Sequence, residues 1–173
     1  MKKYEFTGEV KRIKLIGTEV VLRRIRAVTA FGVVEAGDIG GWIEKEENLS
    51  HDGSAWVRGD AWVYGNARVY GDARVYGDAE VCGDAEVYSA NHIFSIGPVG
   101  SRNEYTTFYR NKNEKIEVRC GCFNGIIEEF LEKVAETHGE NKHASVYRAA
   151  AEIAKLQIEP LSAERRWGCL NNG

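Results

Sequence analysis

The residues best suited to bind a ligand lie in and after a glycine-rich loop, Gly-Pro-Val-Gly-Ser-Arg-Asn, at positions 97–103. Such a loop presents backbone N–H groups, and the Arg102 guanidinium adds a planar fork of donors that fits a phosphate or carboxylate. Two threonines and a second arginine follow on a predicted hairpin. The predicted site for an anion or a nucleotide is Gly100, Ser101, Arg102, Thr106, Thr107 and Arg119. The alternative is that the loop is only a tight connection and that Arg102 pairs with Glu104.

Catalytic side chains form no recognisable pattern. The four histidines are His51, His92, His138 and His143, and none falls within the repeated segment described below. His92 is the one candidate for a general base, with a structural role as the alternative. The signatures of serine hydrolases, zinc proteases and phosphate-binding loops are absent. The sequence therefore predicts neither a catalytic residue nor a cofactor.

The cysteines give no clear metal site. Cys120 and Cys122 flank a single glycine, which is closer than the usual CxxC spacing, and no second Cys/His pair accompanies them. On a strand both thiols would point to one face, so a metal or redox role is an alternative. Incidental thiols in a reducing compartment are the main interpretation, and no metal site is predicted.

Positions 53–88 contain six tandem hexapeptides. They read GSAWVR, GDAWVY, GNARVY, GDARVY, GDAEVC and GDAEVY. Each unit supplies a short strand with alanine and valine on one face, and the glycine supplies a corner. Three units would make one triangular coil, so residue i should lie over residue i+18. The expected pairs are Trp56 over Arg74, Arg68 over Glu86, Tyr70 over Tyr88, Asp60 over Asp78 and Asn66 over Asp84.

The repeat also carries regularly spaced tyrosines, at positions 64, 70, 76 and 88. Exposed aromatic rows favour burial against another molecule, so Tyr64, Tyr70, Tyr76 and Tyr88 are predicted to form a subunit interface. The alternative is that these rows only solubilise the coils and set their register. Because two coils are few for a stable stack, we expect caps at both ends and a homo-oligomer, either a dimer or a trimer.

The flanking segments are expected to cap the repeat. Residues 1–50 read as an N-terminal β cap, with strands at 4–16, 19–28 and 32–35, and with Trp42 and Ile43 sealing the open end. Residues 51–92 are predicted to form a left-handed β-helix of hexapeptide repeats. Residues 93–158 read as a small α+β module with a strand at 93–96, a hairpin at 105–109 and 115–119, and helices at 126–138 and 142–156. Asn141 is the expected N-cap of the second helix, and 159–173 reads as a tail.

Three motifs extend the analysis by resemblance. The repeat resembles the hexapeptide-repeat left-handed β-helix family, which includes trimeric CoA-dependent acetyltransferases. The order LRRIRAV, AGDIGGWIEKEENLS and GDARVYGDA over residues 4–88 is similar to YdcK-like, prophage-associated proteins. GPVGSRN and RCGCFNG, within 93–156, resemble a small C-terminal module of phage and mobile-element proteins. The resulting fold class is mainly β, a short left-handed parallel β-helix of two or more coils, capped by a β-hairpin region and followed by the α+β module.

Composition narrows the function classes. A net charge of −3 argues against direct nucleic-acid binding, and no apolar run is long enough to cross a membrane. The N-terminus lacks an apolar signal segment, so a cytoplasmic location is expected, in the host cell if the protein is phage-encoded. The predicted function is non-enzymatic anti-defence binding, either of a host defence protein or of a nucleotide or other phosphate-bearing small molecule. The alternatives are a CoA-dependent acyltransferase and a structural oligomerisation scaffold.

Overall fold

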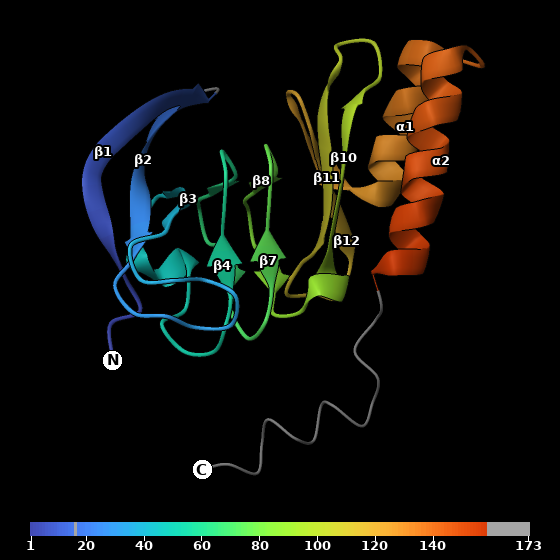
Figure 1. Ribbon diagram of the computed structural model, residues 1–173. Helices are drawn as coiled ribbons and strands as arrows, with labels where there is room; N and C mark the ends of the chain where they lie inside the picture. The colour runs from blue at the N-terminus through green and yellow to red at the C-terminus, as the bar shows by residue number, and fades with distance from the viewer. Residues whose placement is uncertain (16, 159–173) are drawn as a thin grey trace.

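The computed structural model describes residues 1–15 and 17–158. Figure 1 shows an N-terminal hairpin at one side, the repeats in the middle, a second sheet beyond them, and two helices on the far side of that sheet. The hairpin strands are β1 (Tyr4–Leu15) and β2 (Thr18–Ala27), followed by β3 (Ile39–Ile43). The repeat strands are β4 (Trp56–Val57), β5 (Trp62–Val63), β6 (Arg68–Val69), β7 (Arg74–Val75), β8 (Glu80–Val81) and β9 (Glu86–Val87). The C-terminal elements are β10 (Ile93–Val99), β11 (Glu104–Arg110), β12 (Ile116–Cys120), β13 (Phe123–Ile126), α1 (Ile127–His138) and α2 (Lys142–Gln157).

The N-terminal hairpin lies where the alternating sequence predicts it. β1 and β2 pair antiparallel from Tyr4–Ala27 to Leu15–Thr18. The register shifts between Phe6 and Val10, where Gly8 has a φ of 94°. This is a bulge with glycine in a conformation that other residues rarely adopt, and it bends the edge strand.

The third N-terminal strand lies later than predicted. Residues 32–35 form no strand, and Phe31 and Val34 make only an isolated bridge. The strand is β3 instead, although it contains Gly40 and Gly41, which normally weaken strands. Close packing requires these glycines, because a Cβ on Gly40 would lie 2.5 Å from Ile25, and one on Gly41 would lie 2.7 Å from the Ala61 carbonyl oxygen.

The repeats stack with the predicted register. The parallel pairs β4–β7, β5–β8 and β6–β9 place each valine beside the valine 18 residues later. The expected pairs Trp56 with Arg74 and Arg68 with Glu86 are confirmed. The Tyr70 and Tyr88 rings lie 5.4 Å apart. Because the alanines and valines all point inward, they form a continuous core along the stack.

The predicted fold class was nevertheless wrong, since no left-handed parallel β-helix solenoid is indicated among the described residues. The chain has a mixed architecture, with a five-stranded mixed sheet in the order β1-β2-β3-β5-β8, a four-stranded antiparallel sheet in the order β10-β11-β12-β13, and two two-stranded sheets. Each repeat gives only two residues to a strand. The hairpin extends one of the three ladders into a mixed sheet, and helices and antiparallel strands make up the C-terminal part.

The C-terminal module confirms the predicted hairpin and helices. Figure 1 shows α1 and α2 on one side of the four-stranded sheet. Apolar side chains of the sheet and both helices form the core of the module. Asn141 caps α2, and its Oδ1 accepts hydrogen bonds from the N–H groups of His143 and Ala144 at 2.9 and 3.1 Å. The predicted tail, 159–173, lies outside the described residues.

The four-stranded sheet covers the C-terminal end of the repeat stack. Ala85 bridges Asn111, the Lys112 amide donates to the Asp84 carbonyl oxygen at 3.0 Å, and their side chains form an ion pair at 2.8 Å. The Glu80 amide donates to Thr107 Oγ1 at 3.2 Å. These contacts fix the C-terminal module against β8 and β9. Within the described part of the chain, no helix combines the length and apolar character needed to cross a bilayer.

Candidate functional site

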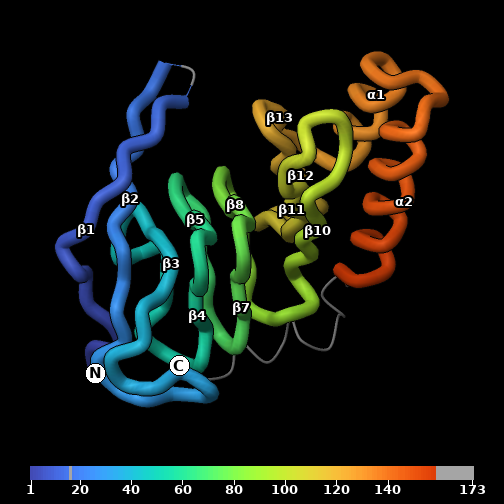
Figure 2. The backbone as a smooth tube through the Cα atoms, turned by 45° about the horizontal axis from the view of Figure 1, so that its top comes forward, coloured from blue at the N-terminus to red at the C-terminus, as the bar shows by residue number. Residues whose placement is uncertain are grey.

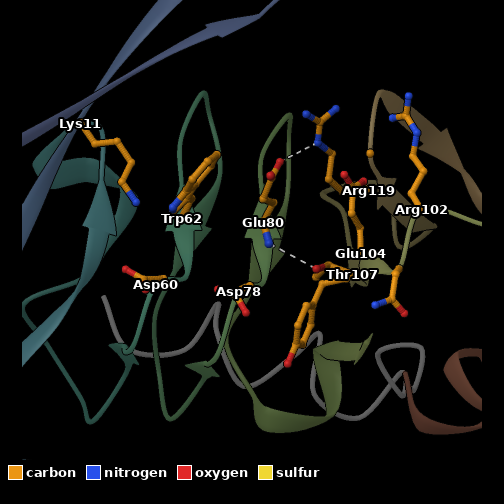
Figure 3. A pocket seen from close by; sticks show the side chains of 12 residues that line it. Lys11, Asp60, Trp62, Asp78, Glu80, Arg102, Glu104, Thr107 and Arg119 are labelled. Atoms are coloured by element: carbon orange, nitrogen blue, oxygen red, sulfur yellow. Dashed lines mark hydrogen bonds and ion pairs between the residues drawn. The ribbon is translucent and has the colours of Figure 1, made fainter. Parts of the chain in front are cut away.

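A groove of about 670 Å³ lies between the N-terminal hairpin and the four-stranded sheet. We call it the inter-sheet groove. Its floor is made by residues of, or next to, β5 and β8, and Figure 2 shows the hairpin and the four-stranded sheet rising on either side of them. The side chains that define it are Lys11 on the hairpin wall, Asp60, Trp62, Asp78 and Glu80 on the floor, and Arg102, Glu104, Thr107 and Arg119 on the opposite wall (Figure 3).

Strand alternation places the floor residues. Val63 and Val81 point into the core, so Trp62 and Glu80 before them point outward. Trp42 of β3 pairs with Trp62, which extends this outward row toward the hairpin. The row therefore presents two indole rings followed by a carboxylate.

Cations from the hairpin lie on the two indoles. The Lys11 ammonium lies 4.6 Å from the centre of the Trp42 ring and 5.0 Å from that of Trp62. The Arg24 guanidinium lies 5.0 Å from the Trp42 ring and 3.5 Å from the Asp60 carboxylate. Such cation–π contacts fix the lysine at the groove wall. The indole N–H of Trp62 is buried and has no hydrogen-bond partner among the described residues.

The opposite wall is anchored by an ion pair. Arg119 Nε lies 2.8 Å from Glu80 Oε2, and both side chains are mostly buried. Burial is the largest single influence on Arg119 and lowers its pKa, but the hydrogen bond to Glu80 and the electrostatic interactions with Tyr64, Glu80 and Cys82 together raise the pKa of the guanidinium above its usual value. Arg119 therefore keeps a positive charge at the groove wall that Glu80 partly neutralises.

Arg102 is the least constrained cation of the groove. It is exposed and forms no hydrogen bond or ion pair with any of the described residues, so the predicted alternative pairing with Glu104 is not observed there. Its guanidinium lies against Gly121, where a Cβ would come within 3.0 Å of Nη1. Arg102 can therefore donate its full set of hydrogen bonds to a ligand.

The structure brings together only part of the predicted anion site. Arg102, Thr107 and Arg119 line the inter-sheet groove. Ser101 lines a neighbouring hollow of about 410 Å³ next to α1. Thr106 is buried and donates to Cys120 Sγ at 3.2 Å, while Gly100 packs against Tyr147 of α2. β10 continues through Val99, so the glycine-rich loop is shorter than predicted. Through Gly100 this loop packs against α2.

The predicted tyrosine interface is divided between faces of the stack. Tyr64 is buried above Cys82, Tyr70 stacks on Tyr88, and Tyr76 is 51% exposed. A spacing of six residues moves each tyrosine to the next side of the stack, and only residues 18 apart share a face. The four tyrosines therefore do not form one continuous surface.

The histidine and cysteine candidates lie away from the groove floor. His92 is buried, with its ring 4.0 Å from that of Tyr88 and its Nε2 3.3 Å from Arg110. Cys120 and Cys122 are free thiols. The described residues contain no group of three or more His, Cys, Asp or Glu side chains that could hold a metal ion.

Sequence reasoning missed Lys11, Trp62 and Glu80 as groove residues. A signal existed for two of them, because the 18-residue register places Trp62 beside Glu80 on an outward face. Lys11 and the walls themselves required knowledge of how the hairpin curves over the repeats. No model of a known protein family matches this sequence, and no curated protein matches it at a significant level. The likeness to prophage-associated proteins therefore rests on the quoted motifs alone.

Proposed function

We propose that this protein is a non-enzymatic binding protein that captures a nucleotide-like small molecule in the inter-sheet groove. One observation carries the proposal: Arg102, which has no hydrogen-bond or ion-pair partner among the described residues, lines the same groove as Arg119, Lys11 and the outward-facing Trp62 (Figure 3). Arginine forks and a lysine suit a phosphate, and an indole suits a flat base. The volume of the inter-sheet groove, about 670 Å³, is within the usual range for small-molecule sites.

The acidic floor adds selectivity for nucleotides over simple anions. Asp60 and Asp78 lie on the groove floor, two residues before Trp62 and Glu80 respectively, and are exposed. Their carboxylates can only accept hydrogen bonds when ionised, so they favour ribose hydroxyl or base amino groups and repel phosphate. A ligand with its phosphate toward Arg119 and Arg102 on one wall, and its sugar and base toward Asp60 and Trp62, satisfies both regions.

This arrangement favours binding over acyl transfer. The acetyltransferases that the repeat resembles use a histidine base, whereas His92 packs between Tyr88 and Arg110 and does not line the groove. Combined with the prophage-like motifs, the geometry supports sequestration of a host nucleotide signal as the anti-defence role. The homo-oligomer and the host protein partner stay predictions.

The test is calorimetric titration of the purified protein with AMP, adenosine and inorganic phosphate. We expect AMP to bind more tightly than either fragment, because only AMP contacts both the cations and the indole. Arg102→Ala should weaken AMP binding by about tenfold or more, since a charge-assisted hydrogen bond contributes about 1.5–3 kcal/mol. The melting temperature should not change, because Arg102 is exposed.

Arg148→Ala is the matched control, since Arg148 is an arginine of α2 that pairs with Glu140 outside the groove. Equal losses in the two variants would show that AMP binds through general charge. Failure of all three probes to bind would reject the proposal, and a fall in melting temperature for Arg102→Ala would assign Arg102 a structural role.

A further inference from the structure

A second hollow continues the inter-sheet groove past Arg119. It has a volume of about 660 Å³, and its lining includes Lys14, Val20, Tyr64, Cys82 and Asn124. Arg119 and Gly121 line both hollows. The two spaces are therefore adjacent at Arg119 and Gly121.

The two hollows offer similar groups in a similar order. Each has a lysine from β1 on the hairpin wall, Lys11 in the first and Lys14 in the second. Trp62 lies at the floor of the first, and Tyr64, two positions later on the same outward side, lies at the floor of the second, where its side chain is buried. Leu15 and Val20 make the hairpin wall of the second hollow apolar, which suits a flat ring.

Arg119 is held where the two hollows join. Its Nε is fixed by Glu80 at 2.8 Å, and the Tyr64 hydroxyl donates to the same carboxylate oxygen at 3.5 Å. Among the described residues, Arg119 donates to Glu80 through Nε. The guanidinium has further N–H groups that can donate to a ligand. A phosphate at this point would leave space of nearly equal volume on each side.

We propose that the ligand is a dinucleotide, with a phosphate at Arg119, one nucleoside over Trp62 and the other in the hollow beside Tyr64. This inference rests on the proposed function, and it adds that both hollows are occupied by one molecule. A mononucleotide fills one hollow and leaves the other to water. A dinucleotide gains the contacts of both hollows for a single loss of translational freedom.

The test compares the dinucleotide adenylyl-(3′–5′)-adenosine with AMP by calorimetry on the full chain. We expect one dinucleotide per chain, bound about tenfold or more tightly than AMP, since covalent linkage makes binding of the second nucleoside intramolecular. Lys14→Ala should weaken dinucleotide binding by about fivefold while changing AMP binding by less than about twofold, as expected for one exposed charge lost from one hollow.

Arg12→Ala is the control, because Arg12 lies on the same strand and pairs with Glu19 outside both hollows. If AMP binds and the dinucleotide binds no more tightly, or if Lys14→Ala and Arg12→Ala behave alike, the second hollow is not used and only the dinucleotide inference fails. If neither compound binds, the proposed function fails with it.

Discussion

The ion pair between Glu80 and Arg119 sets the charge that the inter-sheet groove offers to a ligand. At an Nε–Oε2 distance of 2.8 Å, this ion pair partly neutralises one of the cations that line the groove. A phosphate bound at Arg119 must compete with Glu80 for the guanidinium, and the two negative groups repel each other. This repulsion lowers the free energy gained on binding. The residue that positions Arg119 thus also limits the affinity for an anion.

Glu80→Gln should therefore tighten AMP binding by about threefold to tenfold, because the amide holds Arg119 without a negative charge. The same change should lower the free energy of unfolding by about 1 kcal/mol, the upper end expected for an ion pair that solvent still reaches. Calorimetric titration and urea denaturation measure the two effects. Weaker binding of AMP by the variant would show that Glu80 contacts the ligand directly.

Sequence patterns predicted which residues line the groove better than they predicted the contacts between those residues. Arg102, Thr107 and Arg119 were predicted together from a loop and a hairpin, and all three line the groove. Thr106 was predicted with them, but adjacent residues of a strand face opposite sides, and Thr106 is buried against Cys120. A contact such as Lys11 over Trp62 joins distant parts of the chain, and no local pattern specifies it.

At the scale of elements, the turn between β10 and β11 is tied to α2 by a close contact. Gly100 has a φ of 76°, and a Cβ there would lie 1.8 Å from the Tyr147 hydroxyl oxygen. Burial raises the pKa of Tyr147 to about 12. The hydroxyl therefore stays protonated and packed against the turn that carries Arg102.

Gly100→Ala should lower the free energy of unfolding by about 1–3 kcal/mol more than Gly139→Ala, since only the first adds overpacking to backbone strain. Gly139 also has a positive φ, of 55°, but no atom lies within 4 Å of the added Cβ. Urea denaturation of both variants measures the difference. Equal costs would mean that α2 moves away from the turn without resistance.

Sequence signals at the ends of elements, such as helix caps and turns, predicted the helices and strands well. Asn141 marked the start of α2, and the break between the predicted strands 4–16 and 19–28 fell within one residue of the hairpin turn, since Thr18 already pairs with Leu15. β3 was missed because its two glycines are typical of loops, and only tight packing against Ile25 and Ala61 explains them. The formation of β3 therefore depends on tertiary contacts that cannot be predicted from its own sequence.

For the whole molecule, the repeat predicted a register but not the architecture. The 18-residue spacing correctly paired residues such as Trp56 with Arg74, because it depends only on the repeat length. The fold class failed, because the hairpin joins the ladder of β5 and β8 and the C-terminal sheet covers the other end. The groove arises from both additions and so could not be derived from the repeat.

These connections predict that the chain unfolds as one unit. Trp42, Trp56 and Trp62 report on the N-terminal part, while both described α-helices belong to the C-terminal module. In a Trp167→Phe background, urea curves from tryptophan fluorescence and from circular dichroism at the helical band should coincide. Asp84→Ala, which removes the ion pair to Lys112, should shift both curves equally. Separate midpoints would show that the module folds independently.

The bulge at Gly8 also bears on how the protein behaves at high concentration. β1 is the outer strand of the five-stranded sheet, and an outer strand with free N–H and C=O groups is a template for adding strands from other copies. The bulge interrupts that row, and Lys11, Arg12 and Lys14 add repulsion between like edges. Growth of ordered aggregates through this edge is thereby discouraged.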